Sequence, residues 1–331
     1  MKYYVVCDCR DNFPNYLDGK KIYNDHFSKA SINEIVSTIK ELNHECTYFG
    51  GVKDLIEAID SNSIYPDCIF LNFNDGLTQL HKRGQTPILL EMLSVPYSGA
   101  DPFTSLLVSD KYFTKELIKN TCSDIKIPES ILVFSNLSLD LKNLNIKYPV
   151  IVKPNNEGSS IGIDKNSICY NFDDLRNKIM KLKKTFNNIL IEEYIEGFEF
   201  TVFIVGNKNS YINQPLAIGL NDKYYFEHDV CDADIKCNHK RQYVAPEALL
   251  SSQNVNKLKL IAKQIFDMLH IRDYARLDFR YNNNEFYFIE ANTVPAISST
   301  SDVGEVCKLL HISFKEFVNI LLQTVNDRVE L

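Results

Sequence analysis

The sequence predicts a mixed fold of α/β followed by α+β structure, arranged in about three packed units. In the first 100 residues, short apolar strand patterns alternate with amphipathic helical patterns, which is typical of a parallel α/β unit. Further along the chain, strand patterns follow one another directly, which indicates antiparallel sheets with helices packed against them. The 331 residues are 45% apolar, so the chain can bury more than one hydrophobic core.

The first predicted unit, residues 1–100, alternates strands with helices and ends at a turn. We expect strands at 3–7, 47–49 and 67–72, and helices at 31–42 and 52–60. The turn comes at Pro96-Tyr-Ser-Gly99, where proline and glycine interrupt the periodic patterns. A boundary is therefore placed at about residue 100.

The second and third predicted units cover residues 101–187 and 188–331. In the second we expect a helix at 109–120 capped by Ser109-Asp110, strands at 130–134, 150–153 and 161–163, and a helix at 171–184. In the third we expect strands at 188–193, 199–205, 275–281 and 285–291, and helices at 253–269 and 313–325. The direct succession of strands in these two units supports the α+β assignment.

Charge and hydropathy exclude several classes of partner. The net charge of −7 and the pI near 5.6 leave no overall basic field, so we expect no nucleic-acid partner. No apolar run approaches the roughly 18 residues of a membrane span. The N-terminal segment turns polar too early for a signal peptide. These features predict a soluble, cytoplasmic protein without a membrane partner, whose nine scattered cysteines are reduced thiols.

Residues 275–292 have the pattern of a β-hairpin with an asparagine-rich turn. If the turn centres on residues 283 and 284, antiparallel pairing places Asp278 opposite Glu290. Side chains alternate along a strand, so one face of the hairpin gathers Arg276, Asp278, Glu290 and Asn292. The other face presents Leu277, Phe279, Ile289 and Ala291.

The two opposed carboxylates of this hairpin repel each other unless something compensates them. Mg²⁺ typically takes one or two carboxylates together with substrate phosphates, so a magnesium site is one interpretation. A solvated hairpin face is the other. The loop at 292–301 carries several hydroxyl groups and free amides at a strand end, where α/β proteins place ligands, and this favours the functional interpretation.

Lys153 ends a strand of the buried type, where an unpaired ammonium is costly and a phosphate is a natural partner. The loop at 155–162 is small and polar, and its amides and serine hydroxyls suit a flap over phosphates, although an ordinary hairpin tip has the same pattern. It is not a Walker A loop. The backbone at 189–195 suits a purine edge and Glu199 suits ribose hydroxyls, although surface glutamates are the simpler interpretation of each alone.

Together these segments resemble the D-alanine–D-alanine ligase branch of the ATP-grasp superfamily, over most of the chain from about residue 84 to 325. Five motifs carry the resemblance, in the family's order and spacing. They are Val95-Pro-Tyr-Ser-Gly99 with Ser109-Asp110-Lys111, Tyr148-Pro-Val-Ile-Val-Lys153-Pro with Glu157-Gly-Ser-Ser-Ile-Gly162, Leu190-Ile-Glu-Glu-Tyr-Ile195 with Glu199, Arg276-Leu-Asp278, and Glu290-Ala-Asn-Thr-Val-Pro295. The resemblance implies an ATP-grasp fold preceded by a Rossmann-like, pre-ATP-grasp parallel α/β domain.

The resemblance also implies a role for each of these residues. ATP would be bound by Lys111, Lys153, Glu192, Glu193, Tyr194, Ile195 and Glu199. Two Mg²⁺ ions, for which Mn²⁺ can substitute, would be held by Asp278, Glu290 and Asn292. The catalytic and substrate-binding residues would be Arg276 for the oxyanion, Ser159 for the flap and first substrate, and Ser301 for the carboxylate of the acceptor. Homodimers are usual in this family, so we expect one here.

The implied reaction is ATP-dependent joining of a small carboxylate to a small amine. A carboxylate is a poor acyl donor, so it attacks the γ-phosphate and becomes an acyl phosphate, while Mg²⁺ and lysines neutralise the developing charge. An amine then attacks the acyl carbon, Arg276 and loop amides stabilise the oxyanion, and phosphate leaves. Water must be excluded during this time, which is the role of mobile loops.

The departures from the family pattern concern the substrates. The family's Gly-Gly-x-Ser-x-Glu segment, whose glutamate grips the ammonium of the first substrate, has no clear match in residues 7–31. Its His-Gly-x-x-Gly-Glu-Asp-Gly signature is replaced by residues 72–76 and 83–87, where Arg83 suits either an acidic or differently shaped substrate or a solvated surface. In the mobile loop, the tyrosine is absent and Lys236 is the candidate for its phosphate-binding lysine. Ala296 replaces the glycine of the acceptor loop, where a positive φ is then less available.

Three functions remain open at this point. The altered recognition residues favour a related ligase with different substrates. The first alternative is a D-alanine–D-alanine ligase that makes a precursor of peptidoglycan. The second alternative is a non-catalytic nucleotide-binding module, which the joint presence of both lysines, Arg276 and the three metal-face residues disfavours.

Overall fold

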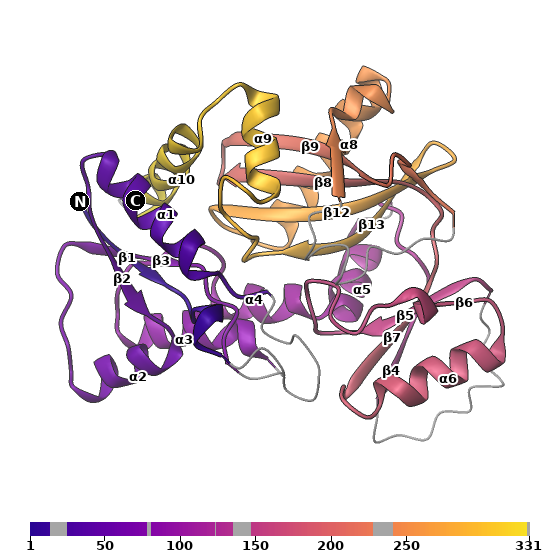
Figure 1. The fold of residues 1–331 in the computed structure, drawn as a ribbon, viewed down its shortest axis with the longest axis horizontal. Coiled ribbons are helices and arrows are strands. Elements are labelled where there is room, and N and C mark those ends of the chain that lie inside the picture. The colour runs from indigo at the N-terminus through magenta and orange to yellow at the C-terminus, as the bar shows by residue number, and fades with distance from the viewer. Residues whose placement is uncertain (14–24, 78–80, 123, 135–146, 228–240, 330–331) are drawn as a thin grey trace.

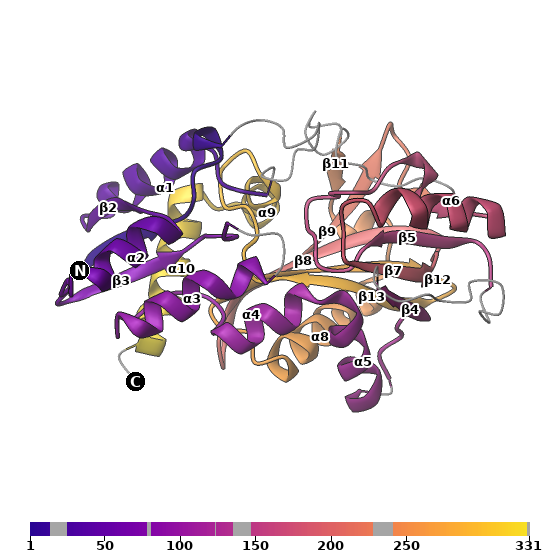
Figure 2. The same ribbon diagram turned by 90° about the horizontal axis from the view of Figure 1, so that it is seen from below.

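The computed structural model describes residues 1–13, 25–77, 81–122, 124–134, 147–227 and 241–329, and it contains three sheets with helices packed around them (Figure 1). The sheets have three, four and six strands. In Figure 2 the helices α3, α4 and α5 follow one another across the molecule, from the N-terminal sheet to the four-stranded sheet. Among the described residues, no helix has both the length and the apolar composition needed to cross a bilayer.

The N-terminal unit is a parallel α/β structure, as the sequence predicts. Its strands pair in parallel in the order β2-β1-β3, and every residue of β3 is buried. Ser28 caps the first long helix by accepting a hydrogen bond from the amide of Ser31. The elements are β1 (Lys2–Val6), η1 (Arg10–Asn12), α1 (Lys29–Glu41), β2 (Glu45–Gly50), α2 (Val52–Asp60), β3 (Cys68–Asn72) and α3 (Lys82–Met92).

Two helices that the sequence did not predict connect this unit to the next. They are α3 and α4 (Pro102–Ser109). Pro87 and Gly84 make the pattern of α3 look unlike a helix, but Gly84 has a packing role. A Cβ added to Gly84 would lie 2.8 Å from the side chain of Leu106, so glycine lets the two helices approach closely.

The central unit has antiparallel strands in the order β4-β7-β5-β6. The helix expected at 109–120 is confirmed as α5, which begins at Lys111 directly after α4, and the side chain of Asp110 caps it by accepting from the amide of Phe113. The strand expected at 161–163 is absent, because Ser159, Ser160 and Gly162 adopt positive φ angles that a strand does not allow. The elements are α5 (Lys111–Thr121), β4 (Ser130–Phe134), β5 (Val150–Pro154), η3 (Lys165–Ser167), β6 (Ile168–Cys169), α6 (Phe172–Leu182) and β7 (Asn188–Glu193).

The C-terminal unit is built on a six-stranded sheet of order β11-β9-β8-β12-β13, with β10 paired to β8. The elements are β8 (Gly197–Gly206), β9 (Ser210–Leu220), β10 (Tyr225–Phe226), β11 (Arg241–Val244), η4 (Pro246–Ala248), α8 (Ser252–Met268), β12 (Tyr274–Asn282), β13 (Glu285–Asn292), α9 (Asp302–Leu310) and α10 (Phe314–Val329). The strands expected at 199–205, 275–281 and 285–291 and the helices expected at 253–269 and 313–325 are confirmed. The strand expected in this unit at 188–193 is β7 of the central sheet, and β9, β10, β11 and α9 are additional.

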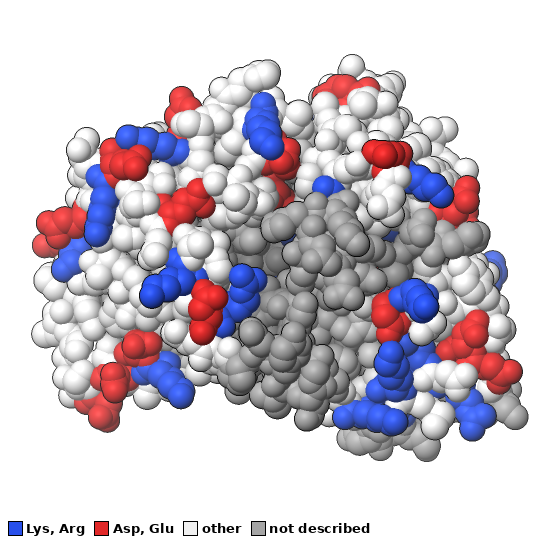
Figure 3. Space-filling model, in the orientation of Figure 1, with Lys and Arg blue, Asp and Glu red and all other residues white. Residues whose placement is uncertain are grey.

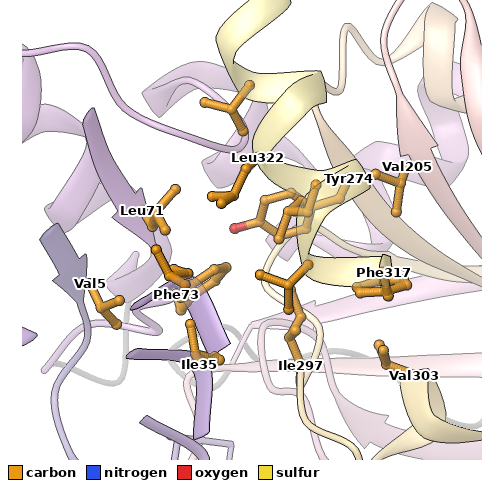
Figure 4. Packing of buried hydrophobic residues seen from close by; sticks show 14 of the residues in the cluster. Val5, Ile35, Leu71, Phe73, Val205, Tyr274, Ile297, Val303, Phe317 and Leu322 are labelled. Carbon is orange, nitrogen blue, oxygen red and sulfur yellow. The ribbon is translucent and has the colours of Figure 1, made fainter. Parts of the chain in front are cut away.

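One hydrophobic core joins the two ends of the chain. Figure 4 shows Leu71 and Phe73, which lie in β3 and just after it, packed near Tyr274 and Leu322. The hydroxyl of Tyr274 donates a hydrogen bond of 2.6 Å to the carbonyl of Asn72. The loop that carries Ile297 lies against the same core. The N-terminal sheet is therefore held directly beside the loop that follows the metal-face hairpin.

Charged side chains of both signs are interspersed over the face in Figure 3. Basic and acidic groups lie next to each other along the visible edges of the described part of the chain. This distribution agrees with the weakly acidic balance of the sequence and with recognition by individual pockets rather than by one charged surface.

Candidate active site

The hairpin of β12 and β13 has the register that the sequence predicts at its polar end. Arg276 pairs with Asn292 and Asp278 pairs with Glu290. A bulge follows Asp278, so that the register shifts by one residue toward the turn. The prediction that Ile289 packs on the apolar face is therefore wrong. Phe288 takes that place in the core, while Ile289 lines the cavity.

The polar face of this hairpin is compensated by ion pairs and is not a solvated surface. The Nε and Nη2 atoms of Arg276 lie 3.0 and 2.9 Å from the carboxylate of Asp278, and its Nη1 lies 3.3 Å from Asp302. Burial by itself would lower the pKa of Arg276, but the two carboxylates raise it above its usual range. Lys111 lies 3.3 Å from Glu290. The carboxylates are only 16% and 23% exposed at Asp278 and Glu290.

The donor set of this face fits a hard divalent cation. Asp278, Glu290 and Asn292 all offer oxygen atoms, and they meet at one end of the hairpin. No group of three or more His, Cys, Asp and Glu side chains suited to a metal occurs among the described residues. Mg²⁺ does not need such a group, since phosphate oxygens and water complete its octahedron. The residues present therefore suit magnesium bound together with a phosphate.

The two predicted phosphate lysines lie at the edges of this face. Lys153 donates a hydrogen bond of 2.8 Å to Glu192, so its partner in this structure is a carboxylate. The Nζ of Lys111 lies 2.5 Å from the carbonyl of Glu157 in the phosphate loop. Burial lowers the pKa of Lys111, which Glu290 partly counteracts. Both ammonium groups are buried next to the loop, as the phosphate interpretation requires.

A third lysine completes this cluster and was missed in the sequence. Lys115 of α5 is fully buried and forms an ion pair with Glu192, which thus bridges Lys115 and Lys153. Burial tends to raise the pKa of Glu192, but the two lysines lower it. The side chain of Glu192 is therefore occupied by its ion pairs with Lys115 and Lys153. The only signal in the sequence was a lysine on the apolar side of a helix, four residues after Lys111.

Replacing Lys115 with methionine is expected to destabilise the protein by about 2–3 kcal/mol, because Glu192 loses one of two buried partners. Burial lowers the pKa of Lys115 to about 8, although Glu192 opposes this. Between pH 8 and the unfolded value of about 10.4, the folded protein binds fewer protons than the unfolded chain. The wild type should therefore gain stability over the variant as the pH rises through that window.

Urea unfolding of both proteins at several pH values measures this effect. Lys119→Met is the matched control, because Lys119 is exposed on the same helix and pairs only at the surface with Glu129. A stability difference between the wild type and the Lys115 variant that stays constant from pH 8 to 10 would contradict the expectation.

A cavity of about 110 Å³ contains the predicted nucleotide-binding segment. Glu193, Tyr194, Ile195 and Glu199 line it, together with Lys153 and Asp278. Glu199 lies 2.8 Å from Arg280, whose guanidinium stacks 4.5 Å from the ring of Phe226. The sequence placed Glu199 here but missed Arg280, which pairs with it across neighbouring strands.

A larger cavity of about 400 Å³ adjoins the end of the hairpin that carries Arg276 and Asn292, and it is also lined by Ser159, Arg83, Ala296 and Ser301. Ser301 caps α9 by accepting from Val303, and its hydroxyl bonds within the 296–301 loop. Ala296 does not adopt a positive φ, so the exchange of glycine for alanine introduces no backbone strain here. Lys236 lies outside the described residues.

Arg83 is a cavity residue, and the alternative of a solvated surface arginine is wrong. Its side chain is 7% exposed. One guanidinium nitrogen donates a hydrogen bond of 2.5 Å to Oδ1 of Asn292, and the other lies 2.8 Å from Asp75. Arg83 therefore connects the N-terminal wall of the cavity to the metal face.

The N-terminal wall of the large cavity is a buried network of charges that the sequence did not reveal. Lys82 lies 2.6 Å from Asp25 and 3.4 Å from Glu157. His26 contacts Asp25 at 3.2 Å and the carbonyl of Gly76 at 3.0 Å. Burial would lower the pKa of His26, but Asp25 raises it. No local pattern indicated this network, since most of its contacts join segments that are distant in the sequence.

Comparison with known proteins agrees with this geometry. A family model described as the C-terminus of D-ala D-ala ligase matches residues 136–323. A D-alanine–D-alanine ligase from Pelagibacter ubique is 34% identical over 285 residues, covering 82% of this chain and 87% of that protein. A D-alanine–D-alanine ligase from Thermotoga maritima is 27% identical over 297 residues, covering 90% of this chain and 92% of that protein.

Solved structures show the same fold. The crystal structure of the Bacillus anthracis D-alanine–D-alanine ligase complexed with ATP matches with a TM-score of 0.73 at 19% identity, over 99% of this chain and 98% of that chain. The VanG D-Ala:D-Ser ligase of Enterococcus faecalis matches with a TM-score of 0.72 at 18% identity, over 98% and 99% of the two chains. The predicted ATP-grasp fold is therefore confirmed.

The family model spans more than half of the chain, and a relative more than 30% identical is covered over most of its length. The alternative of a non-catalytic nucleotide-binding module is set aside, because these relatives are ligases. The chain is an enzyme of the ATP-grasp carboxylate–amine ligase type, and it belongs to the D-alanine–D-alanine ligase family.

Proposed function

We propose that this ligase activates a small carboxylate with ATP and joins it to a small amine, forming an amide bond and releasing ADP and phosphate. The observation that carries the proposal is the position of Glu290. Its side chain lines both the small cavity of the nucleotide segment and the large cavity beside the N-terminal unit. A γ-phosphate entering from one side and a carboxylate entering from the other would meet there.

The ATP side is assigned to the residues around the small cavity. Lys111 and Lys153 contact the phosphates, and the backbone of 192–195 contacts the adenine. Glu199 receives the ribose hydroxyls, with Arg280 holding its carboxylate. The side chain of Glu192 holds Lys153 and Lys115 in place.

The metal side is assigned to Asp278, Glu290 and Asn292, whose oxygens fit two Mg²⁺ ions bound with the phosphates. When bound, these ions supply charge neutralisation at the phosphoryl group being transferred. Asp278 accepts two hydrogen bonds from Arg276 and so holds the guanidinium beside the metal face. Mn²⁺ is expected to substitute.

The reaction proceeds in two steps of nucleophilic attack. A carboxylate oxygen of the donor attacks the γ-phosphorus, the bond to the β-phosphate oxygen breaks, and an acyl phosphate and ADP form. The amine of the acceptor then attacks the acyl carbon, and the bond to the phosphate oxygen breaks after loss of the amine proton. Arg276 and the amides of the 296–301 loop stabilise the oxyanion between these events. Ser159 and Ser301 position donor and acceptor.

For the carboxylate and the amine, two candidate assignments are proposed. The altered recognition residues, Arg83 and Ala296 among them, favour a ligase related to the D-alanine–D-alanine ligases but with changed pockets. The second candidate is D-alanine–D-alanine ligation for peptidoglycan precursors. It is favoured by the names of the relatives, which are D-alanine–D-alanine ligases.

Phosphate release from ATP, measured across a panel of carboxylate and amine pairs, tests the proposal. We expect release that depends on both substrates, stops with EDTA and returns with Mg²⁺ or Mn²⁺. Stimulation by D-alanine alone would favour the second candidate. Release by no pair, or release that persists in EDTA, would contradict the proposed reaction or its metal dependence.

We also propose the domain boundaries, the cellular location and the oligomeric state. The units expected at 1–100, 101–187 and 188–331 are assigned with the second boundary moved to 193/194, because β7 (Asn188–Glu193) pairs within the four-stranded sheet. The protein acts in the cytoplasm and is a homodimer. Sedimentation velocity checks the last point, since a monomer at micromolar concentration would exclude a stable homodimer.

A further inference from the structure

Arg241 is the first residue of β11, and its largely buried guanidinium lines the small cavity. The side chain is 11% exposed. Lys153 and Ser160 line the same cavity, as do Asp278 and Glu290 of the metal face. Strand β11 is fixed in place by antiparallel pairing with β9. Arg241 therefore faces the space in which the phosphates of ATP are proposed to bind.

A single carboxylate, that of Asp302, joins Arg241 to Arg276. Nη1 of Arg276 donates to Oδ2 of Asp302 at 3.3 Å, and Nη1 of Arg241 lies 3.7 Å from the same oxygen. The hydroxyl of Tyr243 donates to the other oxygen, Oδ1, at 2.5 Å. Burial and the charge of Arg241 both act to lower the pKa of Arg276, against the carboxylates that raise it. Two like charges are thus held close together beside the cavities.

The contact of Arg241 with Asp302 is looser than that of Arg276. Arg276 also donates two hydrogen bonds to Asp278, whereas 3.7 Å is too long for a hydrogen bond. Asp302 therefore attracts Arg241 mainly through charge. Burial and Asp302 raise the pKa of Tyr243 above its usual range, and the guanidinium of Arg241 beside the phenol opposes them. A guanidinium carries five N–H donors, so it can bind an oxyanion in addition to such neighbours.

The two arginines face different cavities. Arg276 lines the large cavity and Arg241 lines the small one. The proposed reaction develops negative charge on both sides, at the oxyanion of the acyl carbon and at the phosphoryl group. A phosphoryl group in the small cavity also meets the carboxylates of Asp278 and Glu290, which repel it unless cations compensate. A guanidinium on that side supplies part of the compensation.

We propose that Arg241 is a further catalytic residue, whose guanidinium donates hydrogen bonds to the γ-phosphoryl oxygens during transfer and again when the phosphate leaves the acyl carbon. The inference rests on the proposed ligase function. In the first step the carboxylate oxygen bonds to phosphorus as the bond to the β-phosphate oxygen breaks. In the second the amine nitrogen bonds to carbon as the bond to the phosphate oxygen breaks. Arg241 stays protonated throughout and transfers no proton.

The affinities for ADP and for AMP-PNP, a non-hydrolysable analogue of ATP, test this contact without catalysis. Both are measured by calorimetry on the full-length protein with Mg²⁺. Arg241→Gln should raise the Kd of AMP-PNP by about 10- to 100-fold and leave that of ADP nearly unchanged, because only AMP-PNP carries the γ-phosphoryl group. In turnover, positional isotope exchange in ATP and product formation should both fall, by about 10- to 100-fold.

Arg176→Gln is the matched control, because it makes the same charge change at an exposed position of α6 and should alter neither affinity. Arg241→Lys, which keeps the charge, should lie between the wild type and the glutamine variant, and it replaces that variant if the latter fails to fold.

Two results would overturn the inference alone: an equal loss of affinity for ADP and AMP-PNP, or exchange that persists while product is lost. In the second case Arg241 would act through Asp302 on Arg276. A loss specific to AMP-PNP, in a protein that ligates no carboxylate and amine, would support the phosphate contact and overturn the proposed function. A wild type that binds neither nucleotide would overturn both.

Discussion

Glu290→Gln is expected to lower kcat for ATP-dependent ligation by about 10³-fold or more, a larger loss than we expect from any other single substitution in the site. Glu290 lies directly opposite Asp278 and borders both cavities. Glutamine keeps the shape but removes half of the negative charge that this pair of carboxylates offers to a divalent cation. The affinity for Mn²⁺, followed by electron paramagnetic resonance, should fall in parallel.

Thermal unfolding of the Glu290→Gln variant distinguishes a role of Glu290 in metal binding from a role in stabilising the fold. The variant loses the ion pair with Lys111 but also loses the repulsion from Asp278, so its melting temperature should change little. Glu285→Gln is the matched control, because Glu285 lies on the same strand outside the cavities and pairs only with Lys257 at 3.4 Å among the described residues. Full turnover in the Glu290 variant would show that the metal face is wrongly assigned.

Arg276→Lys should lower kcat for amide formation by about 10²- to 10³-fold while leaving formation of the acyl phosphate nearly intact. The guanidinium is fixed by two hydrogen bonds to Asp278 and a contact to Asp302. A lysine at position 276 keeps the positive charge but lacks the planar set of N–H donors of the guanidinium, so Asp278 and Asp302 cannot fix it in the same position. The second step, in which the oxyanion develops, should suffer most.

Positional isotope exchange in ATP reports the first step, and product formation reports both. The expected result is exchange near the wild-type rate with strongly reduced product. Arg280→Lys is the comparison, because Arg280 supports Glu199 in the nucleotide cavity and its loss should raise KM for ATP instead. An equal loss of exchange and product in the Arg276 variant would contradict a role confined to the oxyanion.

Much of the candidate site follows from local pattern. Alternation along two strands and a central turn were enough to place Asp278 opposite Glu290, because register is a property of one short hairpin. The bulge after Asp278 was not foreseeable, since it depends on how Phe288 packs into the core. That one-residue shift exchanged Ile289 for Phe288 on the apolar face.

Helices α3 and α4 could not be predicted from the sequence for a different reason. Pro87 and Gly84 disfavour a helix by local propensity, and packing against Leu106 overrides that preference. The consequence is functional, because α3 carries Arg83 into the wall of the large cavity and places Lys82 in the charge network behind it. A segment for which the sequence predicted no helix thus supplies two of the buried charges.

By itself, the sequence determined most of the strands and helices and the polar face of the hairpin, while its resemblance to a known family implied the chemistry of ATP activation. The elements and the hairpin face depend on residues a few positions apart, whose relative directions are set by the geometry of a strand or helix. Only the tertiary structure decided that Glu192 bridges Lys115 and Lys153 and that Arg83 turns inward to Asn292. The strength and pairing of a buried charge depend on every neighbour that excludes water from it, and those neighbours come from distant parts of the chain.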